Sequence, residues 1–350
     1  MKNKMSPHQI TVIAIVVLVV LGLACASSPK TADDELVWDE GLTIGVTRIT
    51  DDGIIKNAVN VSPDGTKLLY TESTKKDSDG RLAYNIVYLR DANNPAKTPL
   101  ITDSARAPSW YEDNTRFLYV SIERRAGRLV RSSTAGGGKT YITRTPIGDD
   151  DDTPIIKNGL IVFSTYMNDK WQLVTVKENG TEPTFVGDGW QPSWHPTENK
   201  FVFIRDGNIH EMDIDQGYQA TMLYSDPNFN CYEPSYSPDG KKILFAKGTL
   251  TRVNLTSKKA SKNVILDEIV RRHIFVMEAD GTNLSPISSG KATVFSPSWG
   301  RNGEVFCLVS ISNKAAEIYK LRLRGMEETP QPAAVVRPVV ANEPPDSADD

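Results

Sequence analysis

Short, continuously apolar runs recur along the chain, and several of them follow a turn rich in Ser, Pro, Asp and Gly. The clearest copy reads Ser-Tyr-Ser-Pro-Asp-Gly at 235–240 and leads into the apolar run at 242–245. In such a turn Pro presets φ, Asp bonds its neighbouring backbone and Gly accepts a positive φ, so the chain reverses tightly. An apolar run without alternation is typical of a strand that is covered on both faces. The pattern therefore predicts buried strands separated by tight turns.

The unit occurs six times, and this repeat decides the predicted fold. Its aromatic or aliphatic anchor residues are Val61, Trp110, Ile155, Trp194, Tyr236 and Trp299. They are separated by 49, 45, 39, 42 and 63 residues. Periods of this length, each with four strand-like runs, are typical of propeller blades. We predict an all-β chain, a six-bladed β-propeller of four-stranded blades that spans residues 42–324.

The last unit contains only three strand-like runs, and the third of them lies at 317–321. Near the start of the predicted propeller, the segment Thr47–Asp51 has the pattern of the closing strands in other units. Pairing this segment with the last blade would cover an open sheet edge, which otherwise invites aggregation. We therefore predict that an N-terminal strand closes the ring.

The first residues have the pattern of an export signal. Lys2 and Lys4 precede an apolar stretch at 10–23, which is too short to cross a hydrocarbon core of ~30 Å comfortably as a helix. The next residues, Leu-Gly-Leu-Ala-Cys at 21–25, resemble the lipobox of bacterial lipoproteins. The resemblance implies that residues 1–24 are removed and that Cys25 carries the lipid anchor. An ordinary cleaved signal and an uncleaved anchor helix are the alternatives.

Polar segments flank the predicted propeller on both sides. Residues 25–41 are rich in Ala, Ser, Asp and Glu and read as a tether between lipid and fold. Residues 325–350 hold five prolines among acids and small residues. Such a composition buries too little apolar surface to offset the entropy of ordering, so we predict a disordered tail.

The charge balance argues against nucleic acid as a partner. The chain has 40 Lys and Arg residues against 44 Asp and Glu residues, whereas nucleic-acid binders usually carry a basic field. Removing residues 1–24 takes away Lys2 and Lys4 and no acid, which leaves a net charge of −6. An exported protein is permitted a disulfide, but Cys231 and Cys307 belong to different strand units, so we interpret both as unpaired.

The repeated Ser-Trp/Tyr-Ser-Pro-Asp-Gly pattern, followed by Lys-x-apolar and later by Asp-Gly, resembles the TolB-type β-propeller repeat. This repeat also occurs in the propeller domains of prolyl-oligopeptidase-like enzymes, and residues 233–282 match it best. The resemblance covers residues 43–324 and implies a protein-binding role in the cell envelope. We expect neither the α/β domain that precedes the TolB propeller nor a hydrolase domain, because no Gly-x-Ser-x-Gly elbow is found.

Candidate chemistry is sparse. By the repeat, His195 falls in the turn after a first strand, whereas His210 and His273 fall in third strands of different units, and no pair has the spacing of metal ligands. A calcium loop needs spaced ligands and a turn Gly, so we predict that the acids Asp149–Asp152 form a solvated interblade loop instead. We therefore predict no catalytic residues, no metal site and no cofactor.

Three loops between second and third strands, at 73–83, 122–128 and 247–272, are long and basic. In a propeller these loops share one face with the interblade connections, and long loops on a rigid scaffold commonly carry binding sites. The loop face holds Lys75, Lys76, Arg81, Arg124, Arg125, Arg128, Lys258, Lys259, Lys262, Arg271 and Arg272. We hypothesise that it docks an anionic surface, either an acidic protein or a glycan or lipid headgroup. Solvation of exposed loops is the simpler alternative.

Together these features predict a lipoprotein of the cell envelope that binds envelope proteins as a non-catalytic, monomeric scaffold. Ala26 after the lipid cysteine is not acidic, which favours the outer membrane. Two alternatives remain. A glycan or small-molecule receptor would have an aromatic-lined channel, and a lyase or glycosidase would have His, Asp and Glu residues clustered in the channel.

Overall fold

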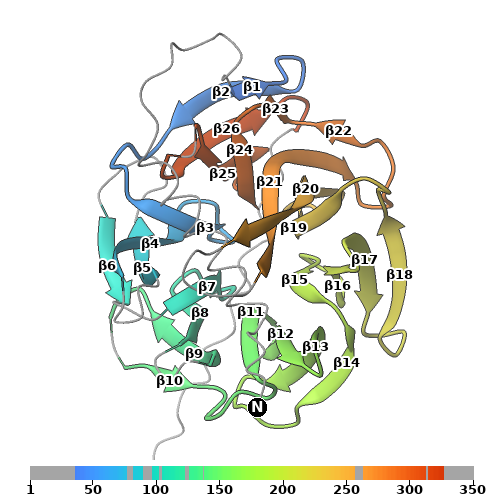
Figure 1. The fold of residues 1–350 in the computed structure, drawn as a ribbon. Coiled ribbons are helices and arrows are strands. Elements are labelled where there is room, and N and C mark those ends of the chain that lie inside the picture. Colours follow the sequence, from blue (N-terminus) through green and yellow to red (C-terminus); the bar gives the residue numbers. More distant parts are fainter. Residues whose placement is uncertain are drawn as a thin grey trace, which may run out of the picture.

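The chain folds into six four-stranded antiparallel sheets arranged around a common axis (Figure 1). The computed structural model describes residues 36–76, 82–89, 97–101, 105–122, 126–136, 138–256, 263–312 and 314–326. These residues form strands, turns and connections and contain no helix. The predicted six-bladed, all-β propeller is therefore confirmed.

The first three blades follow the order of the sequence. Blade 1 contains β3 (Ile55–Val61), β4 (Leu68–Lys76), β5 (Leu82–Leu89) and β6 (Lys97–Ile101). Blade 2 contains β7 (Ala105–Trp110), β8 (Arg116–Ser121), β9 (Arg128–Ser133) and β10 (Thr140–Tyr141). Blade 3 contains β11 (Asp150–Lys157), β12 (Leu160–Met167), β13 (Lys170–Lys177) and β14 (Thr184–Asp188).

The last three blades complete the ring. Blade 4 contains β15 (Trp190–Trp194), β16 (Lys200–Arg205), β17 (Asn208–Asp213) and β18 (Gln219–Tyr224). Blade 5 contains β19 (Asn230–Tyr236), β20 (Lys242–Thr256), β21 (Asn263–Glu278) and β22 (Ser285–Pro286). Blade 6 contains β24 (Thr293–Trp299), β25 (Glu304–Ser310), β26 (Glu317–Leu323) and β2 (Thr43–Arg48). A small extra sheet pairs β1 (Leu36–Trp38) with β23 (Ser288–Gly290).

The second strand of each blade forms the core, as the continuous apolar runs predict. The segments Leu68–Tyr70, Phe117–Val120, Ile161–Phe163, Phe201–Ile204, Ile243–Ala246 and Val305–Leu308 are fully buried. Each fully buried large side chain contributes roughly 1.5–3 kcal/mol relative to exposure. Because a blade cannot cover both of its own faces, this burial requires a neighbour on each side. The core therefore runs around the ring in the spaces between blades.

The Ser-Pro-Asp-Gly turns work as the sequence predicts. In blade 5, the Gly240 N–H donates to the Ser237 carbonyl over 2.8 Å, and the Asp239 carboxylate accepts the Lys241 N–H over 3.1 Å. Gly240 has a φ of +73°, and a Cβ there would lie 2.3 Å from Nε2 of His195 in blade 4. The turn therefore needs glycine for its backbone and also for contact with the next blade.

The inner strands share an irregularity that the sequence analysis did not predict. Each pairs with its neighbour through a register shift, and in five blades a residue with positive φ lies at the shift and precedes a proline. These residues are Ala107, Thr153, Gln191, Glu233 and Ser296, with φ between 46° and 54°. A β-bulge bends its strand and re-aims a side chain. The bulges thus determine which polar groups lie along the inner strands.

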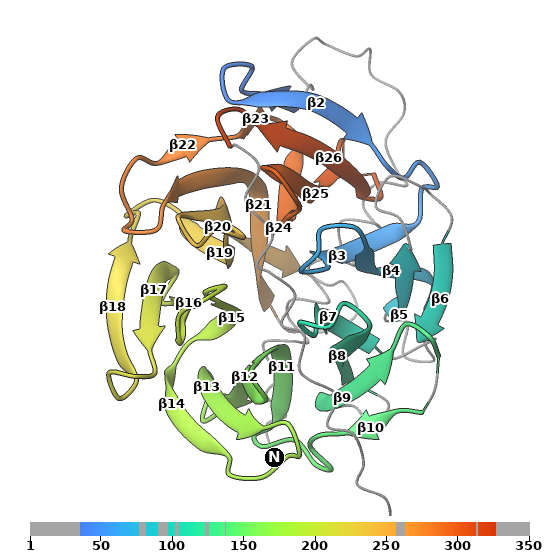
Figure 2. The ribbon, with the colours of Figure 1, turned by 180° about the vertical axis from the view of Figure 1, so that it is seen from behind.

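The N-terminal segment closes the ring, as predicted. β2 pairs antiparallel with β26, with Thr43 opposite Leu323 and Arg48 opposite Tyr319. β1 adds to the outer edge beside blade 5, and both strands lie at the perimeter in Figure 1, as β2 does in the opposite view of Figure 2. β1 falls within the predicted tether, 25–41, so part of that segment is a strand. The predicted tail lies outside the described residues from 327 onward.

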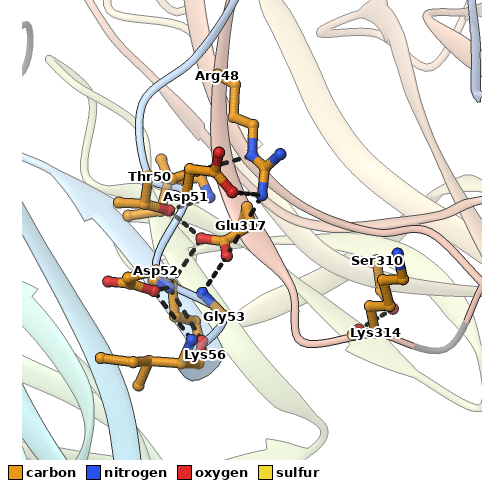
Figure 3. Close-up of polar contacts among 11 residues, drawn as sticks. Arg48, Thr50, Asp51, Asp52, Gly53, Lys56, Ser310, Lys314 and Glu317 are labelled. Carbon is orange, nitrogen blue, oxygen red and sulfur yellow. Dashed lines mark hydrogen bonds and ion pairs between the residues drawn. The ribbon is translucent and has the colours of Figure 1, made fainter.

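A buried ion pair holds the closure together (Figure 3). The Lys56 ammonium, whose side chain is fully buried, lies 3.0 Å from the Glu317 carboxylate of β26. The same carboxylate accepts hydrogen bonds from the Thr50 hydroxyl over 2.6 Å and from the Gly53 N–H over 2.8 Å. Removing one member of such a pair leaves an uncompensated buried charge, which is strongly destabilising. The first and last parts of the propeller are therefore interdependent.

Candidate binding face

The alternation of strand direction gives the propeller two distinct faces. The hairpins between second and third strands lie on the same side as the connections from one blade to the next, because each blade has four antiparallel strands. We call this side the upper face, and the Ser-Pro-Asp-Gly turns lie on the opposite, lower face. The hairpins β4–β5, β8–β9 and β20–β21, which contain the predicted basic loops, all belong to the upper face.

The segment 247–272, predicted as a long loop, is instead a hairpin. Beyond Gly248, eight further residue pairs join β20 to β21, from Thr249 opposite Val270 to Thr256 opposite Asn263. Seen along the ring axis, the far end of this hairpin lies over the centre of the ring (Figure 1). The loop prediction was wrong, because residues 249–256 and 263–270 pair through their backbones and extend the second and third strands of blade 5.

Most of the predicted basic residues lie where the structure describes no side chain. Lys75 and Lys76 belong to β4, but only their backbone pairing is described. The residues Arg81, Arg124, Arg125, Lys258, Lys259 and Lys262, together with the predicted lipid site Cys25, lie outside the described residues. The prediction for these positions therefore stays a prediction.

Two of the predicted basic residues are not available to a partner in the way we expected. Arg128 is 7% exposed, and its guanidinium lies 4.7 Å from the centroid of the Tyr141 ring. Arg272 lies over the Tyr232 ring at 4.2 Å and pairs with Glu233 at 3.4 Å. Arg128 is thus held against an aromatic ring, and Arg272 is held by an aromatic ring and a carboxylate of its own blade.

Arg271, in contrast, is exposed and lies at a bend of the long hairpin. The register shifts between Gly248 and Thr249, so Arg271 is the extra residue of a bulge, and its φ is +54°. A Cβ on Gly248 would lie 2.6 Å from the Arg271 carbonyl oxygen, so the two backbones cross closely. Arg271 is therefore an exposed residue at a bulge, and its role in binding stays a prediction.

A groove of about 320 Å³ opens beside Arg271 on the outer part of blade 5. It is lined by Phe229, Lys247, Arg271, His273, Phe275 and Gly290. The Phe229 side chain is 40% exposed. Burial lowers the pKa of His273, and its Nδ1 is buried without a hydrogen-bond partner among the described residues. The groove therefore combines aromatic surface with one exposed cation.

The Lys247 ammonium forms one wall of the groove and is already compensated. It lies 3.0 Å from the Asp226 carboxylate and 3.2 Å from the Tyr224 hydroxyl. It also lies 4.4 Å from the centroid of the Phe275 ring. Among the described side chains no carboxylate pairs with Arg271, so Arg271 is the uncompensated charge of the groove.

The polar groups of the inner strands connect neighbouring blades. The Gln191 amide oxygen accepts the Glu233 N–H over 2.8 Å, and the Glu233 carboxylate accepts the Ser296 N–H over 2.7 Å. The Ser296 hydroxyl accepts the Val59 N–H over 3.0 Å. Bulge residues of blades 4, 5 and 6 thus each satisfy a backbone donor of the following blade. Leaving such a donor unpaired would cost roughly 1–3 kcal/mol.

The acids predicted to form a solvated loop are mostly buried in β11. Asp150 is 8% exposed and accepts hydrogen bonds from the Gly127 N–H over 2.6 Å and from the Arg106 guanidinium over 2.8 Å. Asp151 is fully buried, and burial raises its pKa to about 6. The loop prediction was wrong, because donors from blade 2 and from neighbouring strands take the place of water around these carboxylates.

The sequence analysis missed an aromatic ladder on the upper face of blades 3 to 5. Trp171 at the start of β13 stacks on Trp190 of β15, with ring centroids 6.4 Å apart and planes 17° apart. Tyr166 meets Trp171 edge-on at 5.5 Å, and Tyr232 meets Trp190 edge-on at 6.2 Å. The ladder could have been predicted only from the positions of its tryptophans in the repeat. Trp171 follows the β12–β13 turn and Trp190 starts an inner strand, and both positions lie at the upper face.

The histidines and cysteines lie where the repeat predicts. His195 follows β15, and its Nδ1 accepts the Glu198 N–H over 3.0 Å, while His210 and His273 belong to third strands of different blades. Cys231 and Cys307 are buried and unpaired, as interpreted. Within the described ranges, no three His, Cys, Asp or Glu residues form a group that could hold a metal ion.

Within the same part of the chain, no helix is long and apolar enough to span a membrane.

The chain was compared with protein families, curated proteins and solved structures. No family model matches it, and no curated protein matches it. Among solved structures, it resembles the putative TolB from Agrobacterium tumefaciens with 14% identity and a TM-score of 0.54, over 81% of this chain and 98% of that one. These values define the chain as a TolB-like six-bladed β-propeller in fold.

Enzymes share this fold equally well. A gluconolactonase from Xanthomonas campestris is 11% identical with a TM-score of 0.53, over 85% of this chain and 99% of that one. A luciferin-regenerating enzyme is 10% identical with a TM-score of 0.55, over 82% and 97%. Because one fold hosts both catalytic and other proteins, the function of this chain must be argued from its own residues.

Proposed function

We propose that this chain is a lipid-anchored protein of the cell envelope whose propeller binds an acidic protein partner and catalyses no reaction. The observation that carries the proposal is the β20–β21 hairpin, which extends eight residue pairs beyond the bulge at Gly248 and lies over the ring centre (Figure 1). The sequence between these two strands contains Lys258, Lys259 and Lys262. A long basic hairpin on a rigid ring is suited to contact a partner across the channel mouth.

The carboxylates along the inner strands support a structural rather than a catalytic role. Glu233 accepts a backbone N–H of blade 6 and pairs with Arg272. Asp150 pairs with Arg106 at 2.8 Å, and Asp151 accepts hydrogen bonds from the Thr165 hydroxyl and the Ile147 N–H. A general acid or base must reach a substrate proton, whereas these groups hold donors of their own chain.

The path of the N-terminal segment supports anchoring through Cys25. β1 starts at the perimeter, where Leu36 pairs with Gly290 near the upper face. Ten residues separate Cys25 from Leu36, so the tether spans at most roughly 40 Å. A lipid on Cys25 would therefore hold the propeller close to the membrane without crossing any blade.

A face-specific crosslinking experiment tests the binding role. A photoreactive amino acid is placed at Lys259, between β20 and β21 in the sequence, or at Lys241, an exposed residue on the lower face of the same blade, in intact envelopes. We expect an adduct from Lys259 that is lost in the double variant Arg124→Glu, Arg125→Glu, and none from Lys241. Equal adducts from both faces, or an adduct unaffected by the charge reversal, contradict the proposal.

A labelling experiment tests the anchor separately. Metabolic labelling with a fatty acid should mark the protein, and Cys25→Ala should abolish the label and release the protein from membranes. Retention of the label in the Cys25→Ala variant contradicts lipid attachment at this residue.

A second candidate function, a glycan receptor, is favoured by one observation, the aromatic ladder. The stacked pair Trp171 and Trp190 could support the apolar face of a sugar ring, beside the polar side chains of Gln172 and Asp188. Retention on an immobilised envelope glycan, lost with Trp171→Ala and kept with Trp110→Phe, would favour this candidate over protein binding.

A further inference from the structure

The groove on blade 5 lies at the point where the N-terminal segment joins the propeller. Gly290 forms part of its wall and pairs with Leu36, the first described residue. Val37, the next residue of β1, is 51% exposed, and Phe229 on the other side of the groove is 40% exposed. The groove and the tether therefore share one edge of the ring.

The chemistry of this edge fits a membrane interface. Arg271 provides an exposed guanidinium, which binds phosphate oxygens with paired hydrogen bonds. Phe229 and Val37 provide apolar surface, and the combination of basic and apolar side chains is typical of proteins that lie at the headgroup level. The compensated Lys247–Asp226 pair leaves the net charge of the described groove positive.

We propose that this groove binds the phosphate group of an anionic phospholipid, with Arg271 as the phosphate ligand and Phe229 and Val37 at the headgroup layer. The proposal rests on the lipid anchor of the proposed function, because a tether of roughly 40 Å keeps this edge beside the bilayer. Figure 1 places blade 2 across the ring from blade 5. The ring then stands on the blade 5 edge, with blade 2 as the blade farthest from the membrane.

Vesicle binding by the unlipidated protein tests the groove directly. The chain from residue 25 onward, with Cys25→Ser, keeps every described element. We expect it to sediment with vesicles of phosphatidylcholine mixed with phosphatidylglycerol, and less with phosphatidylcholine alone or at high salt. Arg271→Glu should weaken binding roughly thirtyfold, because it removes one positive charge and adds one negative charge, each worth about 1 kcal/mol near an anionic surface.

Matched variants separate the groove from a general charge effect. Lys241→Glu makes the same charge change on the lower face of blade 5 and should leave vesicle binding unchanged. Arg271→Lys keeps the charge but loses the paired hydrogen bonds, so it should bind more weakly than the parent and more tightly than Arg271→Glu, which also shows that the position tolerates substitution. If Arg271→Glu binds like the parent, or if Lys241→Glu loses as much, the groove is not the lipid site.

A label near the tether tests the orientation. Cys231 and Cys307 are buried, and burial raises the pKa of both thiols, so an introduced cysteine reacts selectively. A fluorophore on Val37→Cys should be quenched by brominated lipids, whereas one on Thr140→Cys, on the outermost strand of blade 2, should not. Equal quenching at both positions overturns the orientation.

The two proposals fail in different ways. If the fatty-acid label is absent from Cys25 while Arg271→Glu still weakens vesicle binding, the anchor is wrong and the groove stands. If Cys25 is labelled and both Arg271 variants bind like the parent, the groove is wrong and the anchor stands.

Discussion

Asp151 shows how a single buried acid couples stability to pH. Its carboxylate is fully buried in blade 3 and accepts hydrogen bonds from the Thr165 hydroxyl over 2.8 Å and from the Ile147 N–H over 3.0 Å. Burial raises its pKa from 3.8 to about 6 despite these donors. The folded state therefore takes up a proton at a higher pH than the unfolded state does.

This difference predicts the sign of the pH dependence. The cost of keeping Asp151 ionised is fully present above pH 6 and disappears as the pH falls from about 6 towards 4. Relative to Asp151→Asn, the parent should gain on the order of 3 kcal/mol in unfolding free energy over that range. Urea unfolding of both proteins at several pH values measures this change in the free energy of unfolding.

An exposed acid provides the control for this measurement. Asp280 lies in the hairpin after β21, where hydrogen bonds from Thr282 lower its pKa. Replacing it by Asn should therefore give a pH-dependent difference of the opposite sign. If the stability difference between the parent and Asp151→Asn does not change between pH 4 and pH 7, Asp151 has no raised pKa.

Two tryptophans at the same repeat position make a matched pair. The Trp110 indole N–H donates to the Asn60 carbonyl of blade 1 over 3.1 Å, whereas the Trp194 indole N–H is buried without a partner among the described residues. Trp110→Phe should cost roughly 1–2 kcal/mol more than Trp194→Phe, because only the first breaks a hydrogen bond between blades. Urea unfolding followed by far-ultraviolet circular dichroism measures both. Equal losses of unfolding free energy in the two variants would show that the hydrogen bond of the Trp110 indole adds no stability.

At the scale of elements, the sequence predicts what local chemistry determines. Each of the six anchor residues, from Val61 to Trp299, lies in an inner strand, and the apolar run that follows each is a buried second strand. The turns are local as well, because Pro, Asp and Gly act on adjacent backbone. The closing strand was also predictable, since the last unit lacked a fourth run and an unpaired edge is unfavourable.

Contacts between distant segments were not predictable from the sequence. The segment 247–272 reads as a loop because it is an insertion relative to the repeat, whereas its two halves pair with each other as strands. The acids at 150–152 read as solvated because their partners, Gly127 and Arg106, come from another blade. The groove on blade 5 draws Phe229, Arg271 and Gly290 from separate elements, so no local motif marks it.

At the scale of the whole molecule, the ring depends on the pairing of its two ends. β2 completes blade 6, and Leu36, Trp38 and Leu42 pack against the core cluster that blades 5 and 6 share. The buried Lys56–Glu317 pair joins the first inner strand to the last third strand. Closure therefore combines backbone pairing, apolar burial and a buried charge pair at one junction.

Truncation from the N-terminus tests how much of the stability this junction provides. A chain that begins at residue 36 keeps β1 and β2 and should unfold at the same urea concentration as the chain that begins at residue 25. A chain that begins at residue 49 loses both strands, which exposes the edge of β26 and the apolar surface beneath it. It should unfold at lower urea and associate with rising concentration in sedimentation experiments.

A chain that begins at residue 43 loses only β1, and its urea midpoint should lie between those of the other two truncated chains, because β2 still covers β26. If the chain from residue 49 stays monomeric with an unchanged midpoint, the remaining strands hold the ring closed without the N-terminal segment.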